Sequence, residues 1–204
     1  ELTTPSGAYV LRRKPPGVLL PSAHAVDREF RVISALHGRG FPVARPYALC
    51  LDETVIGSIF YVMDRVDGRV FWDLKLPGLT PDERRAIYHA QTDTLADLHA
   101  FDPAELDLAD YGPPGNYFAR QVGRWTKQYR ASEIDPIPAM DRLIAFLPES
   151  LPPEAPARIV HGDFRLDNMI LTQDAPRVLA VLDWELSTLG DPMADLSYLL
   201  IAWA

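Results

Sequence analysis

Residues 159–171 read IVHGDFRLDNMIL and enclose five charged or polar side chains between two apolar flanks. The flanks, 159–160 and 169–171, are short apolar runs of the kind that indicates buried strands. Polar groups buried between strands raise the free energy of the folded state unless they are hydrogen-bonded or bind a ligand. A surface turn would need only one aspartate or glycine. The stretch therefore predicts a ligand-binding loop between two strands.

The spacing of the polar residues indicates which ligand this loop binds. His161, Asp163 and Asn168 form H-x-D-x-x-x-x-N, and Asp183 lies near the end of RVLAVLDWE (177–185), which we predict to be a strand. An amide and a carboxylate that converge from adjacent strand ends suit an oxygen-liganded cation such as Mg²⁺. A further carboxylate without a metal can accept a proton from a hydroxyl. Protein kinases divide these roles in the same way.

The composition is that of an ordinary globular protein and excludes several other classes. The chain has 204 residues, of which 48% are hydrophobic and 24% charged, which suits one large domain or two small lobes. A net charge of -8, with LRRK (11–14) as the one dense basic cluster, argues against a nucleic-acid partner. No run approaches the roughly 20 apolar residues of a membrane span, and no signal peptide is visible. We therefore expect a cytoplasmic location without membrane contact.

The order of the predicted elements indicates two lobes. The first part is mostly β, with strands over 8–13, 47–52 and 58–64 and one helix over 22–36 after the KPPG turn. The second part is mostly helical and begins with a capping box at Thr80–Glu83. Further helices are expected over 117–129 and, within the stretch 136–151, between Pro138 and Pro148. We predict an α+β fold with a small β-rich N-lobe (1–66) and a larger helical C-lobe (67–204).

Two motifs carry a resemblance to a known family. HGDFRLDN (161–168) followed by VLDWE (181–185) resembles the aminoglycoside-phosphotransferase and choline-kinase-like branch of the protein-kinase-like fold. The resemblance covers nearly the whole chain, and these further stretches share it: YVLRRKPPG (9–17), REFRVISAL (28–36), YVMDRVDGRVFWD (61–73) and WELSTLGDPMADLSYL (184–199). It implies a two-lobed fold that binds ATP and Mg²⁺ between the lobes. The chain is most similar to the phosphotransferase domain associated with acyl-CoA dehydrogenases, which implies hydroxyacyl-CoA thioesters as acceptors.

The resemblance implies a role for individual residues of the catalytic loop and the following strand. Asp163 is expected to be the catalytic base, and Asn168 and Asp183 the metal ligands. Arg165, two residues after Asp163, either lies near the transferred phosphoryl group or forms a structural ion pair. Glu185 either assists a second metal ion or has a structural role.

The N-lobe is implied to hold the nucleotide. Glu29 matches the glutamate that pairs with the phosphate-binding cation, which in this family is usually a lysine. The aligned tetrad YVLR (9–12) puts Arg12 in that place, with Arg13 and Lys14 as alternatives, and an arginine can bind phosphates bidentately. The glycine-rich phosphate loop of the family is expected before Glu1.

The segment that joins the lobes is implied to bind adenine through its backbone groups. It runs from Met63 through Asp64 to Val66.

Three residues outside this segment are expected to have structural roles. His161 orients the catalytic loop by hydrogen bonding, Asp195 anchors that loop, and His99 is a helix cap or a solvent contact.

These features predict a phosphotransferase that moves the γ-phosphoryl group of ATP to a small-molecule hydroxyl. A hydroxyacyl-CoA acceptor would need cations, and one predicted helix carries Arg120, Arg124, Lys127 and Arg130. The alternative is that these cations lie on a solvent-exposed helix face and bind no acceptor. Aromatic residues (Trp125, Tyr129 and Trp184) either line an acceptor pocket or belong to the core. An aminoglycoside or sugar kinase is the alternative enzyme. The alternative that is not an enzyme is a module that binds a nucleotide without turnover. Such a module would not need a catalytic base.

Overall fold

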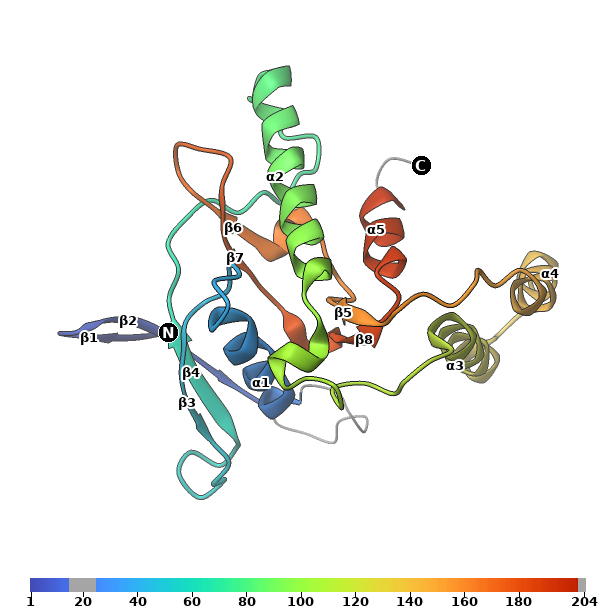
Figure 1. The fold of residues 1–204 in the computed structure, drawn as a ribbon, viewed down its shortest axis with the longest axis horizontal. Helices are drawn as coiled ribbons and strands as arrows, with labels where there is room; N and C mark the ends of the chain where they lie inside the picture. The colour runs from blue at the N-terminus through green and yellow to red at the C-terminus, as the bar shows by residue number, and fades with distance from the viewer. Residues whose placement is uncertain (15–24, 202–204) are drawn as a thin grey trace.

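The computed structural model describes residues 1–14 and 25–201 (Figure 1). Its N-terminal part is a four-stranded antiparallel sheet in the order β1-β2-β4-β3. The strands are β1 (Leu2–Thr4), β2 (Gly7–Arg13), β3 (Pro46–Cys50) and β4 (Phe60–Asp64). The register pairs Arg12 with Tyr61, so these two side chains lie on the same face of the sheet.

Helix α1 (Val26–His37) packs against this sheet and carries Glu29. Val32 and Leu36 are fully buried, four residues apart on one helix face, as expected for an amphipathic helix. The predicted helix began at Ser22, and residues 15–24, with most of the KPPG turn, lie outside the described part of the chain. The helix ends at His37, where Gly38 caps it.

Two short two-stranded sheets lie at the centre of the molecule (Figure 1). Strand β5 (Arg158–Val160) pairs with β8 (Thr188–Gly190), and β6 (Met169–Leu171) pairs with β7 (Val178–Val181). The prediction of one strand over 177–185 is wrong beyond Val181, because Asp183 adopts a left-handed backbone with φ 64°. This conformation cannot continue a strand, and a 3-10 turn, η4 (Trp184–Leu186), follows.

The remaining part is helical. Its α-helices are α2 (Pro81–Ala100), α3 (Tyr117–Ser132), α4 (Pro138–Phe146) and α5 (Met193–Leu200), and its short 3-10 turns are η1 (Pro103–Leu106), η2 (Leu147–Glu149) and η3 (Leu166–Asn168). The predicted capping box starts α2, since Thr80 and Glu83 bond each other's backbone N–H. The helix predicted between Pro138 and Pro148 is α4, which starts at Pro138, ends at Phe146 and is followed directly by η2. The predicted lobe boundary at residues 66–67 lies in the segment between β4 and α2.

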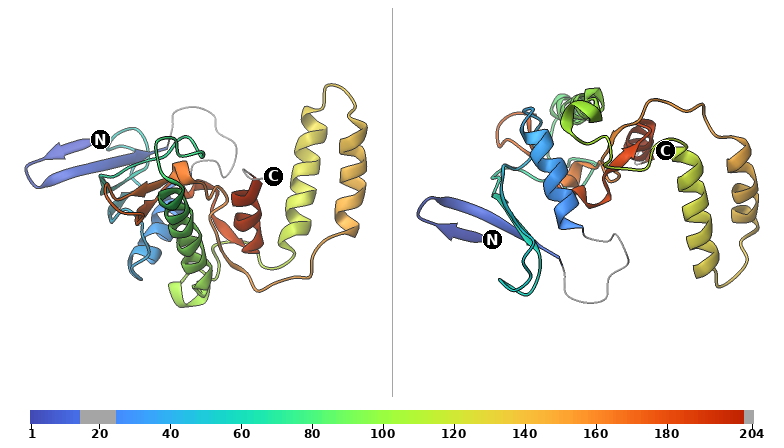
Figure 2. Two further views of the ribbon diagram at one scale, coloured as in Figure 1. Left: turned by 90° about the horizontal axis from the view of Figure 1, so that it is seen from above. Right: turned by 60° about the horizontal axis from the view of Figure 1, so that its bottom comes forward.

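Helices α3 and α4 stand side by side, away from the rest of the chain (Figure 2). Arg130 of α3 and Asp141 of α4 form an ion pair of 2.6 Å. Neither of these two described helices buries a residue fully, and Trp125 of α3 is 54% exposed.

One hydrophobic core connects the sheet, α1 and the central strands. It includes Val32 of α1, Tyr61 of β4 and Met169 of β6. Trp184 is buried against Phe41, with ring centroids 6.0 Å apart, so it belongs to the core and not to an acceptor pocket. Within residues 1–14 and 25–201, no helix is long and apolar enough to cross a membrane.

Candidate active site

The loop between β5 and β6 is held in place by a buried carboxylate of α5. Asp195 of α5 is 0% exposed, and its two oxygens accept from the backbone N–H groups of His161 at 2.7 Å and Gly162 at 2.8 Å. Gly162 has φ 87°, and a Cβ there would lie 3.0 Å from Leu186. A larger residue would therefore be strained in this turn. The contacts agree with the predicted role of Asp195 as the anchor of the loop.

His161 holds the loop by its imidazole ring as well. Its Nδ1 accepts from the backbone N–H of Asp163 at 3.2 Å, so Nε2 carries the proton that bonds the Leu182 carbonyl oxygen at 2.9 Å. Burial lowers the pKa of His161 despite the nearby Asp195 charge. A neutral, fully bonded imidazole of this kind orients the loop, as predicted.

His99 has a different role from the one predicted. Its side chain is 15% exposed and its Nε2 lies 3.2 Å from Asp195 Oδ2. The expectation of a helix cap or a solvent contact is therefore wrong. The two residues are 96 positions apart in the chain, so only the position of the last turn of α2 against α5 brings them together.

Asp163 lies at the edge of the loop with its carboxylate partly exposed. Asn168 Nδ2 donates to Asp163 Oδ2 at 2.8 Å and to its carbonyl oxygen at 2.9 Å. The Tyr198 phenol also bonds this carboxylate, which raises the pKa of the tyrosine. The predicted base therefore sits in a fixed orientation at the surface of the loop.

Arg165 forms ion pairs within the same loop. Its Nε lies 3.0 Å from Asp163 Oδ1, and its NH2 group lies 3.2 Å from Asp167 Oδ2. The side chain remains 46% exposed. The structure thus contains the ion pair of the structural alternative, with the guanidinium still accessible from solvent.

The two predicted metal ligands come from neighbouring segments. The N–H group of Leu182 donates to the Asn168 carbonyl oxygen at 2.8 Å, which ties the loop to the residue before Asp183. Among the described residues, no group of three or more His, Cys, Asp or Glu side chains could hold a metal ion. The donors present are the Asn168 amide and the Asp183 carboxylate, with Glu185 nearby, and oxygen donors of this type fit Mg²⁺.

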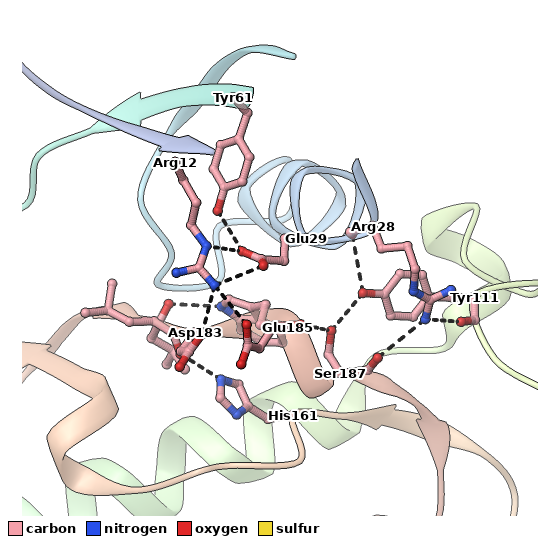
Figure 3. A network of polar contacts seen from close by, with 12 residues as sticks. Arg12, Arg28, Glu29, Tyr61, Tyr111, His161, Asp183, Glu185 and Ser187 are labelled. Atoms are coloured by element: carbon pink, nitrogen blue, oxygen red, sulfur yellow. Dashed lines mark hydrogen bonds and ion pairs between the residues drawn. The ribbon is translucent and has the colours of Figure 1, made fainter. Parts of the chain in front are cut away.

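Arg12 joins the sheet, α1 and the Asp183 segment (Figure 3). Its Nε lies 2.6 Å from Glu29 Oε2, and its NH2 group lies 3.1 Å from Asp183 Oδ1 and 3.4 Å from Glu185 Oε2. Burial alone would lower the pKa of Arg12, but the hydrogen bond and charge of Glu29 outweigh it and raise the pKa. One guanidinium thus contacts three carboxylates. The alternatives Arg13 and Lys14 lie at the exposed end of β2.

Tyr61 completes this network and was missed in the sequence. Its hydroxyl donates to Glu29 Oε2 at 3.1 Å, and its side chain is almost fully buried. Burial and the Glu29 charge raise the pKa of the phenol, so it stays protonated and can donate. Glu29 is itself 1% exposed, and a buried carboxylate requires such partners. The cross-strand pairing of Tyr61 with Arg12 that brings it here depends on strand register, which the sequence pattern did not indicate.

The predicted adenine-binding residues lie where β4 ends. Met63 and Asp64 are its last two residues, and Val66 follows two positions later. The Asp64 carboxylate accepts a hydrogen bond from the Tyr47 hydroxyl at 2.8 Å, and the backbone N–H of Asp64 donates to the Arg45 carbonyl oxygen. Met63 and Asp64 follow Tyr61 of the Arg12 network by two and three residues on the same strand.

Two of the four cations predicted for an acceptor are occupied. Arg120 donates to the carbonyl oxygens of Pro113 and Pro114, and Arg130 pairs with Glu133 and Asp141. The two others, Arg124 and Lys127, are exposed on α3.

Comparison with known proteins gives consistent matches. A model of the phosphotransferase enzyme family matches residues 1–204. Human acyl-CoA dehydrogenase family member 11 is 52% identical over 191 residues, which is 93% of this chain and 24% of that protein. The chain therefore spans about a quarter of the length of this relative.

Solved structures are similar over nearly the whole chain. A Ralstonia eutropha JMP134 protein, solved as a candidate aminoglycoside phosphotransferase, has a TM-score of 0.88 and 51% identity over 98% of this chain and 59% of that one. The GDP complex of aminoglycoside 2'-phosphotransferase-IIIa has a TM-score of 0.65 at 17% identity, over 85% of this chain and 60% of that one. The predicted α+β, kinase-like fold is confirmed.

Proposed function

Because this chain belongs to the phosphotransferase enzyme family, we propose that it transfers the γ-phosphoryl group of ATP to a hydroxyl of a small molecule. The observation that carries this proposal is the meeting of Arg12 and Asp183 within 3.1 Å, beside the loop of Asp163 and Asn168. A phosphate-binding cation, oxygen donors for a metal ion and a carboxylate base then lie in adjoining segments. These are the parts that phosphoryl transfer requires.

In this proposal Asp163 accepts the proton of the acceptor hydroxyl. Asn168 keeps the carboxylate in place through its 2.8 Å hydrogen bond, which leaves the amide oxygen of Asn168 for a cation. A base within hydrogen-bonding reach of the hydroxyl contributes typically 10²–10⁴-fold to such a reaction. Arg165, with an accessible guanidinium, neutralises charge on the transferred group.

Arg12 and the metal ligands bind the phosphates. Arg12 is held by Glu29 through two of its nitrogen atoms, so its guanidinium is oriented before ATP arrives. Asn168 and Asp183 would hold Mg²⁺, which when bound neutralises negative charge on the phosphate oxygens. The backbone of Met63, Asp64 and Val66 would contact adenine.

The acceptor that we propose is a hydroxyacyl-CoA. The supporting observation is the 52% identity to a protein named as an acyl-CoA dehydrogenase family member. The exposed cations Arg124 and Lys127 on α3 would face its phosphate groups. An aminoglycoside or sugar is the second candidate, because the Ralstonia structure at 51% identity was solved as a candidate aminoglycoside phosphotransferase.

The test is a direct assay of the intact protein. It is incubated with Mg²⁺, ATP labelled at the γ-phosphorus and separate panels of hydroxyacyl-CoAs, aminoglycosides and sugars. We expect label in a hydroxyacyl-CoA, and no transfer by an Asp163→Asn variant. If the label appears only in an aminoglycoside or a sugar, the proposed acceptor is wrong and the proposed phosphoryl transfer is supported. ATP binding without transfer to any panel would contradict the phosphotransferase function.

A further inference from the structure

Two adjacent residues hold α1 from different sides. Glu29 contacts Arg12 and Tyr61 of the sheet. The neighbouring Arg28 donates to the carbonyl oxygens of Tyr111, at 2.7 Å, and Ser187, at 3.5 Å (Figure 3). Successive residues of an α-helix point about 100° apart. The position of Glu29 therefore depends on contacts with the sheet and on contacts with the helical part.

The Tyr111 hydroxyl forms the buried part of the second contact. It lies 2.7 Å from Ser187 Oγ and 3.3 Å from the Arg28 carbonyl oxygen, and the side chain is 1% exposed. Ser187 Oγ donates its own proton to the Trp184 carbonyl oxygen at 2.5 Å, so it accepts from Tyr111. Burial raises the pKa of Tyr111, which keeps the phenolic proton available. The Arg28 guanidinium lies 4.3 Å from the centroid of the tyrosine ring.

A close backbone approach brings Tyr111 to this place independently of its hydrogen bonds. A Cβ on Gly112 would lie 2.5 Å from Thr188 Oγ1 and 2.6 Å from the Leu189 nitrogen. Because a backbone nitrogen in β8 cannot give way, only glycine fits here. The segment that carries Tyr111 is thus pressed against the segment that carries Ser187.

The outer contacts of the same helix are more exposed. Arg31 of α1 donates to Asp107 and Asp110, and Arg39, two residues beyond the end of α1, donates to the Glu105 carbonyl oxygen at 2.7 Å. Exposed ion pairs contribute little to stability. In comparison with these exposed contacts, the one between Tyr111 and Ser187 is shielded from water.

We propose that Tyr111, with Arg28 and Ser187, is a positioning site for phosphoryl transfer. Ser187 lies four residues after Asp183, so the contacts of Arg28 with Tyr111 and of Tyr111 with Ser187 connect the helix of Glu29 with the turn of Asp183. The site fixes α1, and through Glu29 also Arg12, at one distance from that turn. It acts through these groups and does not touch the reacting atoms. The inference rests on the proposed function of the preceding section.

The first test replaces Tyr111 by phenylalanine in the intact protein. The ring and its contact with the Arg28 guanidinium remain, whereas the hydroxyl contacts with Ser187 Oγ and the Arg28 carbonyl oxygen are lost. Ser187 keeps its bond to Trp184, so no buried donor loses its partner. One hydrogen bond corresponds to about a fivefold change in an equilibrium. We expect kcat to fall by about fivefold with an unchanged KM for the acceptor. The matched control is Tyr88→Phe, which removes a phenol bond from α2 to the Leu74 carbonyl oxygen and should keep the parental kcat.

A second background separates positioning from general loss of structure. In a Glu29→Gln variant the link from α1 to Arg12 is already weakened. If Tyr111 acts through this link, Tyr111→Phe should lower kcat less than twofold further, because the two effects are coupled. The same fivefold loss in both backgrounds would overturn the proposal.

A measurement without ATP separates this inference from the proposed function. Hydrogen exchange of the α1 backbone amides should be about fivefold faster in Tyr111→Phe and unchanged in Tyr88→Phe. A parent protein without phosphotransferase activity would refute the proposed function, whatever the exchange rates are. An active parent whose Tyr111→Phe variant has parental kcat and parental exchange would refute the positioning site alone.

Discussion

The buried carboxylate of Asp195 allows a stability prediction of its own. It accepts three hydrogen bonds, from the backbone of His161 and Gly162 and from His99 Nε2. Asparagine has nearly the same shape but only one side-chain oxygen. In an Asp195→Asn variant, an NH₂ group must therefore face one of the two backbone N–H donors. The loop that carries Asp163 then loses one of its two backbone hydrogen bonds to residue 195.

The size of the effect follows from these contacts. Hydrogen bonds to a charged group contribute about 1.5–3 kcal/mol each, and an unsatisfied buried donor costs about 1–3 kcal/mol. Removing the buried charge offsets part of this loss. We expect the free energy of unfolding to fall by about 2–4 kcal/mol, which is a large fraction of the usual 5–15 kcal/mol. We also expect kcat to fall, because the position of Asp163 is no longer fixed.

Urea unfolding followed by tryptophan fluorescence measures this change. The control is Asp191→Asn, since the buried Asp191 accepts one backbone N–H, that of Met193, at 2.9 Å. The amide oxygen of asparagine can replace that single acceptor, so we expect a loss below about 1 kcal/mol. Equal losses in the two variants would refute the role of Asp195 as a loop anchor.

Four further predictions concern the candidate site and the pH dependence. Asp163→Asn should lower turnover by roughly 10²–10⁴-fold and leave ATP binding intact, and near-normal turnover in a steady-state assay would remove the residue from the base role. Asp183→Ala should abolish the Mg²⁺ dependence of ATP affinity in calorimetry; unchanged binding would show that the carboxylate is not a ligand. Arg124→Glu should raise the KM for an acyl-CoA strongly and keep ATP affinity, whereas an unchanged KM would exclude the α3 cations. Because burial lowers the pKa of His161 below 6.5, the unfolded chain binds its proton first, so unfolding free energy should fall with slopes up to about 1.4 kcal/mol per pH unit below pH 6.5. In urea titrations at several pH values, His161→Asn should reduce this dependence of the unfolding free energy on pH. An unaltered dependence would show that His161 is not its source.

The catalytic loop and the general order of elements could be predicted because their signals are local. His161, Asp163 and Asn168 lie within eight residues, and a fixed spacing between two apolar runs places them in one loop. The capping box at Thr80 is equally local. The strand predicted over 177–185 was too long, because an apolar run does not indicate that the backbone at Asp183 is left-handed.

The contacts between distant segments could not be predicted in this way. Tyr61 is 32 residues from Glu29, Asp195 is 96 from His99, and Ser187 is 76 from Tyr111. Which pairs meet depends on strand register and helix packing, which a single sequence does not encode in its periodicity. The ion pair between Arg130 of α3 and Asp141 of α4 likewise depends on how these two helices pack.

The left-handed backbone at Asp183 sets stability against function at this position. A non-glycine residue in that conformation carries strain of about 1 kcal/mol or more, although aspartate tolerates it better than most side chains. Glycine would remove the strain and, with it, the carboxylate that we propose as a metal ligand. Selection for thermal stability alone would favour glycine here, whereas selection for catalysis would keep aspartate. The choice of residue at position 183 in engineered variants therefore reports which of the two properties was under selection.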